Sequence, residues 1–285
     1  MKKLLIVALA LLFVAAAPAM AREVTLDASR DSQLVSSESN KGNGGKFYYS
    51  VSGGATSLET TLVGWDLSGV SLAAGEYVAS GTMRFYSSGS GNNFNWNLEC
   101  YPLLKSWGEG VGIPADGFGG IGWPWGPINL GDSSYTYQNV TSRVADANYT
   151  YIANGGTAWA SPGATGTSGT NKDCDGTKQM TQSTWIAAGT GDQQSLGDLA
   201  LTAAGCDVVE DWISGALTNN GVVLILTDAR DPSVMHLATR EYTCADASQC
   251  PGPYAAELEL EILPEPGTLG LLGLGLIGLI RRRRR

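Results

Sequence analysis

The chain has 285 residues, of which 43% are hydrophobic and 16% are charged, and its formal net charge at pH 7 is -9. Its 27 acidic residues outnumber its 18 basic ones, which excludes a nucleic-acid partner because contact with phosphates requires a basic surface. The single histidine also excludes a zinc site of the usual His-rich kind.

Residues 1–21 predict a cleavable signal for export. They combine Lys2 and Lys3 with an apolar stretch over 4–17 and the small-residue sequence Ala-Met-Ala at 19–21, which is the build of a secretory signal peptide. An uncleaved anchor is the alternative, but the apolar stretch is shorter than the roughly 20 residues that span a bilayer comfortably. We therefore expect the folded protein to begin at Arg22, outside the cytoplasm.

Strand signals recur between Arg22 and Leu263, separated by turn-forming clusters of Gly, Ser, Asn and Asp. Several segments alternate polar and apolar residues, as in ELELEI at 257–262, and this period of two buries one face of a strand. The segments are 22–27, 46–51, 58–67, 76–86, 94–103, 221–228, 234–240 and 255–263. They predict an all-β fold, an antiparallel jelly-roll-like sandwich with long loops and one short helix.

The sequence between these strands predicts loops and a single short helix. Residues 108–193 are dense in Gly, Pro, Ser and Thr and show little periodicity. Because no apolar pattern there would build a second core, we expect long loops laid over one domain of residues 22–263. Loops of this length in a compact domain are commonly functional. Helical signals are confined to 208–214, with Asp207 placed to cap them.

Trp123 and Trp125, in the sequence GWPWGP, are the predicted carbohydrate-binding residues. Prolines keep this segment extended, and glycines allow the aromatic rings to approach the face of a sugar ring. The alternative is that both rings pack over the sandwich as loop cover. Trp107 and Trp212, by contrast, are expected in the core.

Residues suited to catalysis are sparse. Carboxylate pairs for glycoside hydrolysis could be drawn from Glu109 with Asp116, or from Glu210 with Asp211, but residues close in sequence rarely face one substrate. His236 alternates with apolar neighbours as a strand residue does, and no Gly-x-Ser-x-Gly sequence accompanies it. We therefore expect a protein that is not an enzyme.

The five cysteines predict disulfides, because the chain is expected in an oxidising compartment. Cys244 and Cys250 bracket a short loop and form the favoured pair. Among Cys100, Cys174 and Cys206, a pair of Cys100 with Cys206 is preferred, and the odd thiol stays unassigned.

Residues 264–285 close the chain in three ordered parts. Pro264, Glu265 and Pro266 come first, and a glycine-rich apolar run over 267–280 follows them. Cationic side chains after an apolar run stay on the cytoplasmic side of a membrane. Here they are Arg281, Arg282, Arg283, Arg284 and Arg285.

The order of these parts resembles a PEP-CTERM sorting signal. The resemblance implies recognition by an exosortase-type processing protease of Gram-negative bacteria that make extracellular polysaccharide. It also implies transient membrane anchoring, cleavage near the tripeptide and release to the cell surface or extracellular matrix. A plain tail anchor is the alternative, since arginines also follow ordinary membrane helices.

Several segments of the body resemble the DNRLRE-type carbohydrate-binding module, a β-sandwich of secreted and surface proteins. In chain order they are Asp31, Trp65 to Ser68, Thr82 to Tyr86, Trp107 to Glu109, Trp159 to Gly163, Val208 to Trp212 and Thr239 to Glu241. The resemblance implies carbohydrate binding, although the swollen stretch 108–193 departs from the family pattern.

Three residues of these segments, Asp66, Arg240 and Glu241, are candidates for a structural polar core. Arg240 and Glu241 alternate across a strand, so one of them faces inward. A buried arginine needs a carboxylate partner, for which Asp66 and Glu109 are available. Asp66 could instead fold back on backbone amides at a strand end.

Charge limits the partner of the processed protein. Loss of Lys2, Lys3 and the five terminal arginines takes the net charge from -9 to -16, which argues against simple ion exchange with an acidic polysaccharide. A structural calcium ion could bridge carboxylate and carbonyl oxygens; no other cofactor is indicated, and no metal ligands are assigned.

We expect a non-catalytic surface or matrix protein that binds or organises extracellular polysaccharide. The alternatives are a structural protein that assembles through strand edges and a polysaccharide-degrading enzyme.

Overall fold

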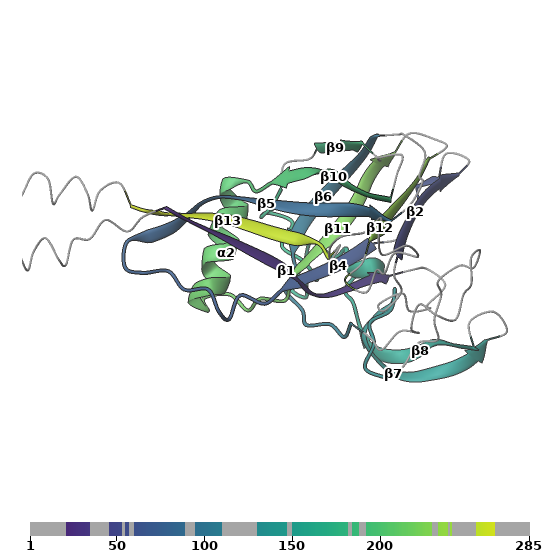
Figure 1. Ribbon diagram of the computed structural model, residues 1–285. Helices are drawn as coiled ribbons and strands as arrows, with labels where there is room; N and C mark the ends of the chain where they lie inside the picture. Colours follow the sequence, from purple (N-terminus) through teal and green to yellow (C-terminus); the bar gives the residue numbers. More distant parts are fainter. Residues whose placement is uncertain are drawn as a thin grey trace, which may run out of the picture.

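Most of the described chain is β-strand. A computed structural model describes residues 21–34, 46–52, 55–56, 60–88, 95–109, 130–146, 150–181, 184–187, 192–229, 233–238, 240 and 255–265 (Figure 1). The strands are β1 (Arg22–Leu34), β2 (Lys46–Ser52), β3 (Ala55–Thr56), β4 (Thr60–Trp65), β5 (Glu76–Ser88), β6 (Asn95–Pro102), β7 (Tyr137–Asp146), β8 (Thr150–Ala158), β9 (Thr184–Ala187), β10 (Asp192–Ala200), β11 (Val222–Ala229), β12 (Ser233–Ala238) and β13 (Glu257–Pro264). Each of the predicted strand segments contains one of these strands or overlaps it.

Strand β1 joins the two layers of a sandwich. Its first half, 22–27, pairs with β13, and its second half, 28–34, pairs with β4, with a shift in register between Ala28 and Arg30. From β13 the first layer continues to β5 and β10, and from β4 the second continues to β11, β6 and β9, all in antiparallel pairs. The curled sheet in Figure 1 confirms the predicted all-β antiparallel sandwich.

The main core fills the space between these layers. It includes Met83 and Phe85 of β5, Leu258, Leu260 and Ile262 of β13, Val63 and Trp65 of β4, Leu98 and Cys100 of β6, and Val222 and Leu224 of β11. The alternation predicted for 257–262 is confirmed, because the three apolar side chains are buried and the three glutamates are not. Burial of each large apolar side chain stabilises the fold by roughly 1.5–3 kcal/mol.

Helix α2 (Ala203–Ser214) covers one end of this core with Val208, Val209 and Trp212. It begins earlier than predicted, and its N-terminal cap is Thr202, whose Oγ1 accepts a hydrogen bond from the Gly205 N–H at 3.0 Å. Asp207 lies inside the helix, so the predicted cap is wrong. The sequence pattern did not predict this start, because the first turn of the helix contains Gly205, a poor helix former. Glycine is required there by a tertiary contact, since a Cβ would lie 2.2 Å from the carbonyl oxygen of Met180.

In the second layer of the sandwich, β4 is buried on both faces. All six residues of β4 are buried, and Leu62 and Val223, which alternate with core residues, belong to a second apolar cluster outside the layer. Their partners there come from segments that the sequence assigns to loops and their flanks: Leu103, Trp107, Trp159, Ala164 and Cys174. A third layer therefore covers β4 and β11, and it consists of the two segments 103–109 and 159–174.

The expectation that 108–193 forms only loops is wrong in part. Strands β7 and β8 pair as a separate two-stranded sheet, and β9 joins the edge of the main sheet at β6. The hairpin of β7 and β8 escapes pattern analysis because residues 141–145 are exposed on both faces. Its small apolar cluster holds only Val140, Ala153 and Tyr137 among the described residues, so no buried face imposes an alternation.

A buried carboxylate holds the third layer in place. Asp173 has 0% exposure, and its two oxygens accept hydrogen bonds from the backbone N–H groups of Ala160 at 2.7 Å, Ser161 at 2.8 Å and Gly166 at 3.0 Å. The ammonium group of Lys105 lies 2.8 Å from Oδ1. A carboxylate removed from water requires such compensation, so Asp173 ties the residues after β8 to the segment that follows β6.

The predicted pairing of Cys100 with Cys206 is wrong. Cys100, Cys174 and Cys206 are buried free thiols, with Cys100 on β6 and Cys206 on α2, and the Cys100 sulfur lies 3.7 Å from the Met83 sulfur. The position of a cysteine near an apolar segment does not determine which buried residues it meets in the fold. The predicted pair of Cys244 and Cys250 lies outside the described residues.

We expect Asp173→Ala to lower the free energy of unfolding by about 3–5 kcal/mol, because it leaves Lys105 and three N–H groups without their buried acceptor. Urea denaturation followed by tryptophan fluorescence measures the loss. Asp175→Asn is the matched control, since Asp175 bonds the N–H and hydroxyl of nearby Thr177 and an amide oxygen can accept the same bonds. Equal stability of the two variants would show that the third layer does not depend on Asp173.

Native alkylation should spare Cys100 and Cys174. Burial raises the pKa of the Cys174 thiol to about 12 and also raises that of Cys100, so at pH 8 roughly one Cys174 thiol in ten thousand is ionised. Iodoacetamide should label both residues after unfolding and neither before it, as read by peptide mass spectrometry. A disulfide-linked Cys100–Cys206 peptide from the exported protein would contradict this expectation.

Candidate functional site

Trp107 is a core residue, as predicted, and it anchors the segment that follows β6. The ring is 5% exposed, its Nε1 donates a hydrogen bond to the Asn220 carbonyl at 2.7 Å, and the Arg30 guanidinium lies 4.4 Å from the ring centroid. Arg30 also donates to the Trp107 carbonyl at 3.2 Å. Burial lowers the pKa of Arg30, and the nearby Glu109 carboxylate opposes that shift, so the cation is kept in a partly dry site.

Glu109 and Arg240 meet beside Trp107. Arg240 Nη2 lies 3.1 Å from Glu109 Oε1, and the same oxygen accepts the Asp31 N–H at 2.9 Å. Asp31 is 2% exposed, and its Oδ2 accepts the Arg240 N–H at 2.7 Å, while Arg240 Nη1 donates to the Ser29 carbonyl at 2.7 Å. Three segments far apart in the sequence thus form one polar cluster.

Asp66, another candidate for the polar core, lies outside this cluster. Asp66 is exposed, and its Oδ1 accepts the Ser68 N–H at 2.9 Å, which lowers the pKa of the Asp66 carboxyl. It is a local turn residue, and the partner of Arg240 is Glu109. Glu241 lies outside the described residues, as do the predicted sugar-binding residues Trp123 and Trp125.

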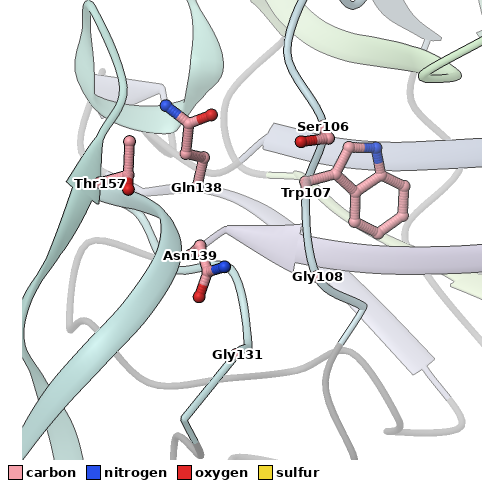
Figure 2. A pocket seen from close by; sticks show the side chains of 7 residues that line it. All are labelled: Ser106, Trp107, Gly108, Gly131, Gln138, Asn139 and Thr157. Atoms are coloured by element: carbon pink, nitrogen blue, oxygen red, sulfur yellow. The ribbon is translucent and has the colours of Figure 1, made fainter.

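A polar pocket opens next to this cluster, with a volume of about 410 Å³. One wall is the segment 106–108, and the other is the hairpin of β7 and β8 together with Gly131. Its lining residues are Ser106, Trp107, Gly108, Gly131, Gln138, Asn139 and Thr157. Figure 2 shows the Trp107 ring on the side of its segment away from the hairpin, so the ring supports this wall from behind.

Close backbone contact between two glycines shapes the pocket. A Cβ on Gly108 would lie 1.8 Å from the Gly131 carbonyl oxygen, so no other residue fits between Trp107 and Glu109. Gly131 has φ of +95°, a conformation that favours glycine. The Ser133 N–H donates to the Gly108 carbonyl at 2.9 Å, and the Gly131 N–H donates to the Val140 carbonyl at 2.9 Å, which joins both walls.

The side chains lining the pocket are uncharged donors and acceptors. Asn139 and Thr157 are exposed and lie opposite each other on β7 and β8, while Gln138 Nε2 donates to the Ala158 carbonyl at 3.0 Å. Figure 2 shows the Gln138 and Asn139 amides extending in opposite directions from the hairpin. Amide and hydroxyl groups of this kind hydrogen-bond neutral polar ligands. The sequence offered no signal for this site, because the hairpin that presents it carries no alternation.

The carboxylates considered for catalysis make structural contacts. Glu109 serves the polar cluster, Glu210 Oε1 accepts the Val78 N–H at 2.6 Å, and Asp211 lies 3.4 Å from the Lys178 ammonium group. Asp116 lies outside the described residues, and His236 lies on β12, as predicted.

Neither a metal site nor a membrane span is found among the described residues. Within the ranges given above, His, Cys, Asp and Glu side chains form no group of three or more suited to a metal ion. In the same part of the chain, no helix has the length and apolar character to cross a bilayer.

Comparison with known protein families assigns one end of the chain. Residues 263–285 match the PEP-CTERM protein-sorting motif, which confirms the predicted sorting signal in Pro264, Glu265, Pro266 and the terminal arginines. No curated protein matches the chain. The motif begins inside the fold, because Leu263 and Pro264 belong to β13 and the Glu265 N–H donates to the Gly75 carbonyl at 2.6 Å.

We expect a coupling free energy of about 1 kcal/mol between Glu109 and Arg240, because the pair is partly exposed and supported by neighbouring hydrogen bonds. A double-mutant cycle of Glu109→Ala and Arg240→Ala in urea denaturation measures it. Glu109→Gln should cost less than Glu109→Ala, since an amide oxygen still accepts the Asp31 N–H. Strictly additive losses would show that the two side chains do not act together.

Proposed function

We propose that this protein, exported and sorted through its PEP-CTERM motif, binds extracellular polysaccharide at the cell surface or in the matrix without cleaving it. The observation that carries the proposal is the pocket between the segment 106–108 and the hairpin of β7 and β8. Its walls are held by backbone contacts and by the buried Trp107, so the pocket is preformed, as ligand sites commonly are.

The chemistry of the pocket favours a neutral sugar. Ser106, Asn139 and Thr157 offer hydroxyl and amide groups, which match the donor and acceptor pattern of sugar hydroxyls. Loss of both terminal signals removes seven of the 18 basic residues and leaves 11 against 27 acidic ones, a net charge of -16. This negative charge repels an anionic polysaccharide. The proposed ligand class is therefore a neutral polysaccharide segment.

Trp123 and Trp125, the predicted sugar-binding residues, belong to the chain segment that connects the two walls of the pocket. The segment that contains Trp123 and Trp125 leaves the described chain after Glu109 and rejoins it at Leu130, and both ends adjoin the pocket. Five residues lie between Trp125 and Gly131, so the six Cα–Cα steps of chain limit their separation to roughly 20–22 Å. Aromatic stacking on a sugar face would complement the hydrogen-bonding groups.

A non-catalytic role is supported by the use of the available carboxylates. Glu109 holds Asp31 and Arg240, and Glu210 holds the N–H of Val78. A general acid or nucleophile must instead contact substrate, and the two carboxylates of a glycosidase flank one bond. Release of reducing ends from a polysaccharide that vanishes in Glu109→Gln would overturn this part of the proposal.

Binding should be lost when the pocket side chains are truncated. We expect Asn139→Ala with Thr157→Val to weaken binding at least about 10-fold, the effect of losing two or more hydrogen bonds. Affinity electrophoresis of the exported protein in gels that contain neutral or acidic polysaccharides measures the effect. Asn154→Ala is the control, because Asn154 is exposed on β8 and does not line the pocket.

Retardation in a neutral gel that survives in Asn154→Ala and disappears in the double variant supports the pocket. Equal retardation of all forms would move the site elsewhere, and loss in Trp123→Ala with Trp125→Ala alone would place it on that segment. Self-assembly without sugar and without retardation in any gel would favour a structural protein that assembles through its own contacts.

A further inference from the structure

Both processing signals adjoin the same end of the sandwich. β1 begins at Arg22 and β13 ends at Pro264, in antiparallel register with Arg22 opposite Ile262, and the two strand ends lie together in Figure 1. Strand β5 begins at this end as well, with Glu76 opposite Pro264. The residues before it, 71–75, therefore lie where the sorting motif leaves the fold.

The turn 71–76 contacts both junctions. Glu76 Oε2 accepts the Ala73 N–H at 2.8 Å and lies 3.3 Å from Arg22 Nη2, and Arg22 also donates to the Ser71 carbonyl. The Ala73 N–H holds the pKa of the Glu76 carboxyl below its usual value, so the carboxylate is ionised at neutral pH. The adjacent Gly75 carbonyl accepts the Glu265 N–H at 2.6 Å.

The first residue of the sorting tripeptide, Pro264, is thus part of the sheet, and Glu265 is hydrogen-bonded directly beside it. Pro264 pairs with β5, and Glu265 continues the pairing through Gly75, whose φ of +81° sets the direction of its carbonyl. On the other side β1 begins at Arg22, opposite Ile262, so β5 and its turn are the described elements paired with Pro264 and Glu265. No chain separates the folded domain from the tripeptide, since β13 runs into it.

We propose that residues 71–76 form a clasp on the sorting tripeptide, and that this clasp must open before the processing protease can cleave the chain. A protease binds its substrate as an extended backbone with free N–H and C=O groups, and paired groups are not free. The rate of processing of the folded protein then scales with the fraction of molecules in which Glu265 is released. This proposal is independent of the pocket and of any polysaccharide.

Glu76 is the residue through which the clasp can be tested. Glu76→Ala removes the acceptor for the Ala73 N–H and the partner of Arg22, whereas Glu76→Gln keeps an acceptor and removes the charge. Loss of one or two such bonds raises the open fraction by a factor of about three to ten. We expect processing of Glu76→Ala to be faster by that factor and processing of Glu76→Gln to be intermediate.

The experiment is a pulse–chase of the full chain in a host that carries the processing protease. Loss of the terminal segment is followed by the mass of the labelled protein. Glu23→Ala is the control, because Glu23 is exposed on β1 next to Arg22 and makes no contact with the turn in the described part of the structure. A second variant inserts Gly-Ser-Gly-Ser between Leu263 and Pro264, which moves the tripeptide and everything after it off the turn without altering Glu76.

Faster processing of Glu76→Ala and of the insertion variant, with Glu23→Ala unchanged, supports the clasp. The melting temperature of each processed product shows whether the domain itself stays folded. If Glu76→Ala unfolds at a lower temperature, faster processing of the insertion variant still supports the clasp, because that variant keeps Glu76. Processing at the unaltered rate in both variants, or more slowly in the insertion variant, overturns the proposal. A wild-type chain that is never processed overturns it as well.

Discussion

The buried carboxylate of Asp173 is the interaction on which the third layer and the proposed binding pocket depend. Its hydrogen bonds to Ala160, Ser161 and Gly166, together with the ion pair to Lys105, are the compensation that a dry charge requires. They fix the end of β8 relative to the segment that leads to Trp107. Those two pieces of chain carry the opposite walls of the pocket, so Asp173 supports the backbone contacts that join the walls.

This arrangement explains how a stretch without a hydrophobic pattern becomes ordered. The third layer contributes few apolar side chains, but each packs on a face of β4 and β11 that would otherwise meet water. Hydrogen bonds then fix the position of this layer on the sheet, because Trp107 and Trp159 each donate an indole N–H to a backbone carbonyl. Close backbone contact between Gly108 and Gly131 adds to this. A site built in this way presents backbone and amide groups on a rigid support.

The sorting motif follows the folded domain without a linker, because its first residues belong to β13. Because β13 is flanked by β1 and β5 and ends in the tripeptide, the strand that completes the core also leads to the terminal signal. Under the proposed clasp, folding and processing involve the same hydrogen bonds at one end of the sheet. The polar cluster of Asp31, Glu109 and Arg240 stabilises the region near the pocket, where the register of β1 shifts from one layer to the other.

The sequence alone determined the positions of the strands in the two main layers other than β9 and β10, the burial of Trp107 and Trp212, and the sorting signal at the end of the chain. Each of these rests on local information: a period of two, an apolar residue between strand signals, or an ordered tripeptide, apolar run and arginine cluster. The tertiary structure alone decided the hairpin of β7 and β8, the start of α2 at Thr202, the free thiols and the pocket. These depend on contacts between segments distant in the chain, such as Asp173 with Lys105 or Gly205 with Met180, and such contacts leave no periodic trace in the residues that make them.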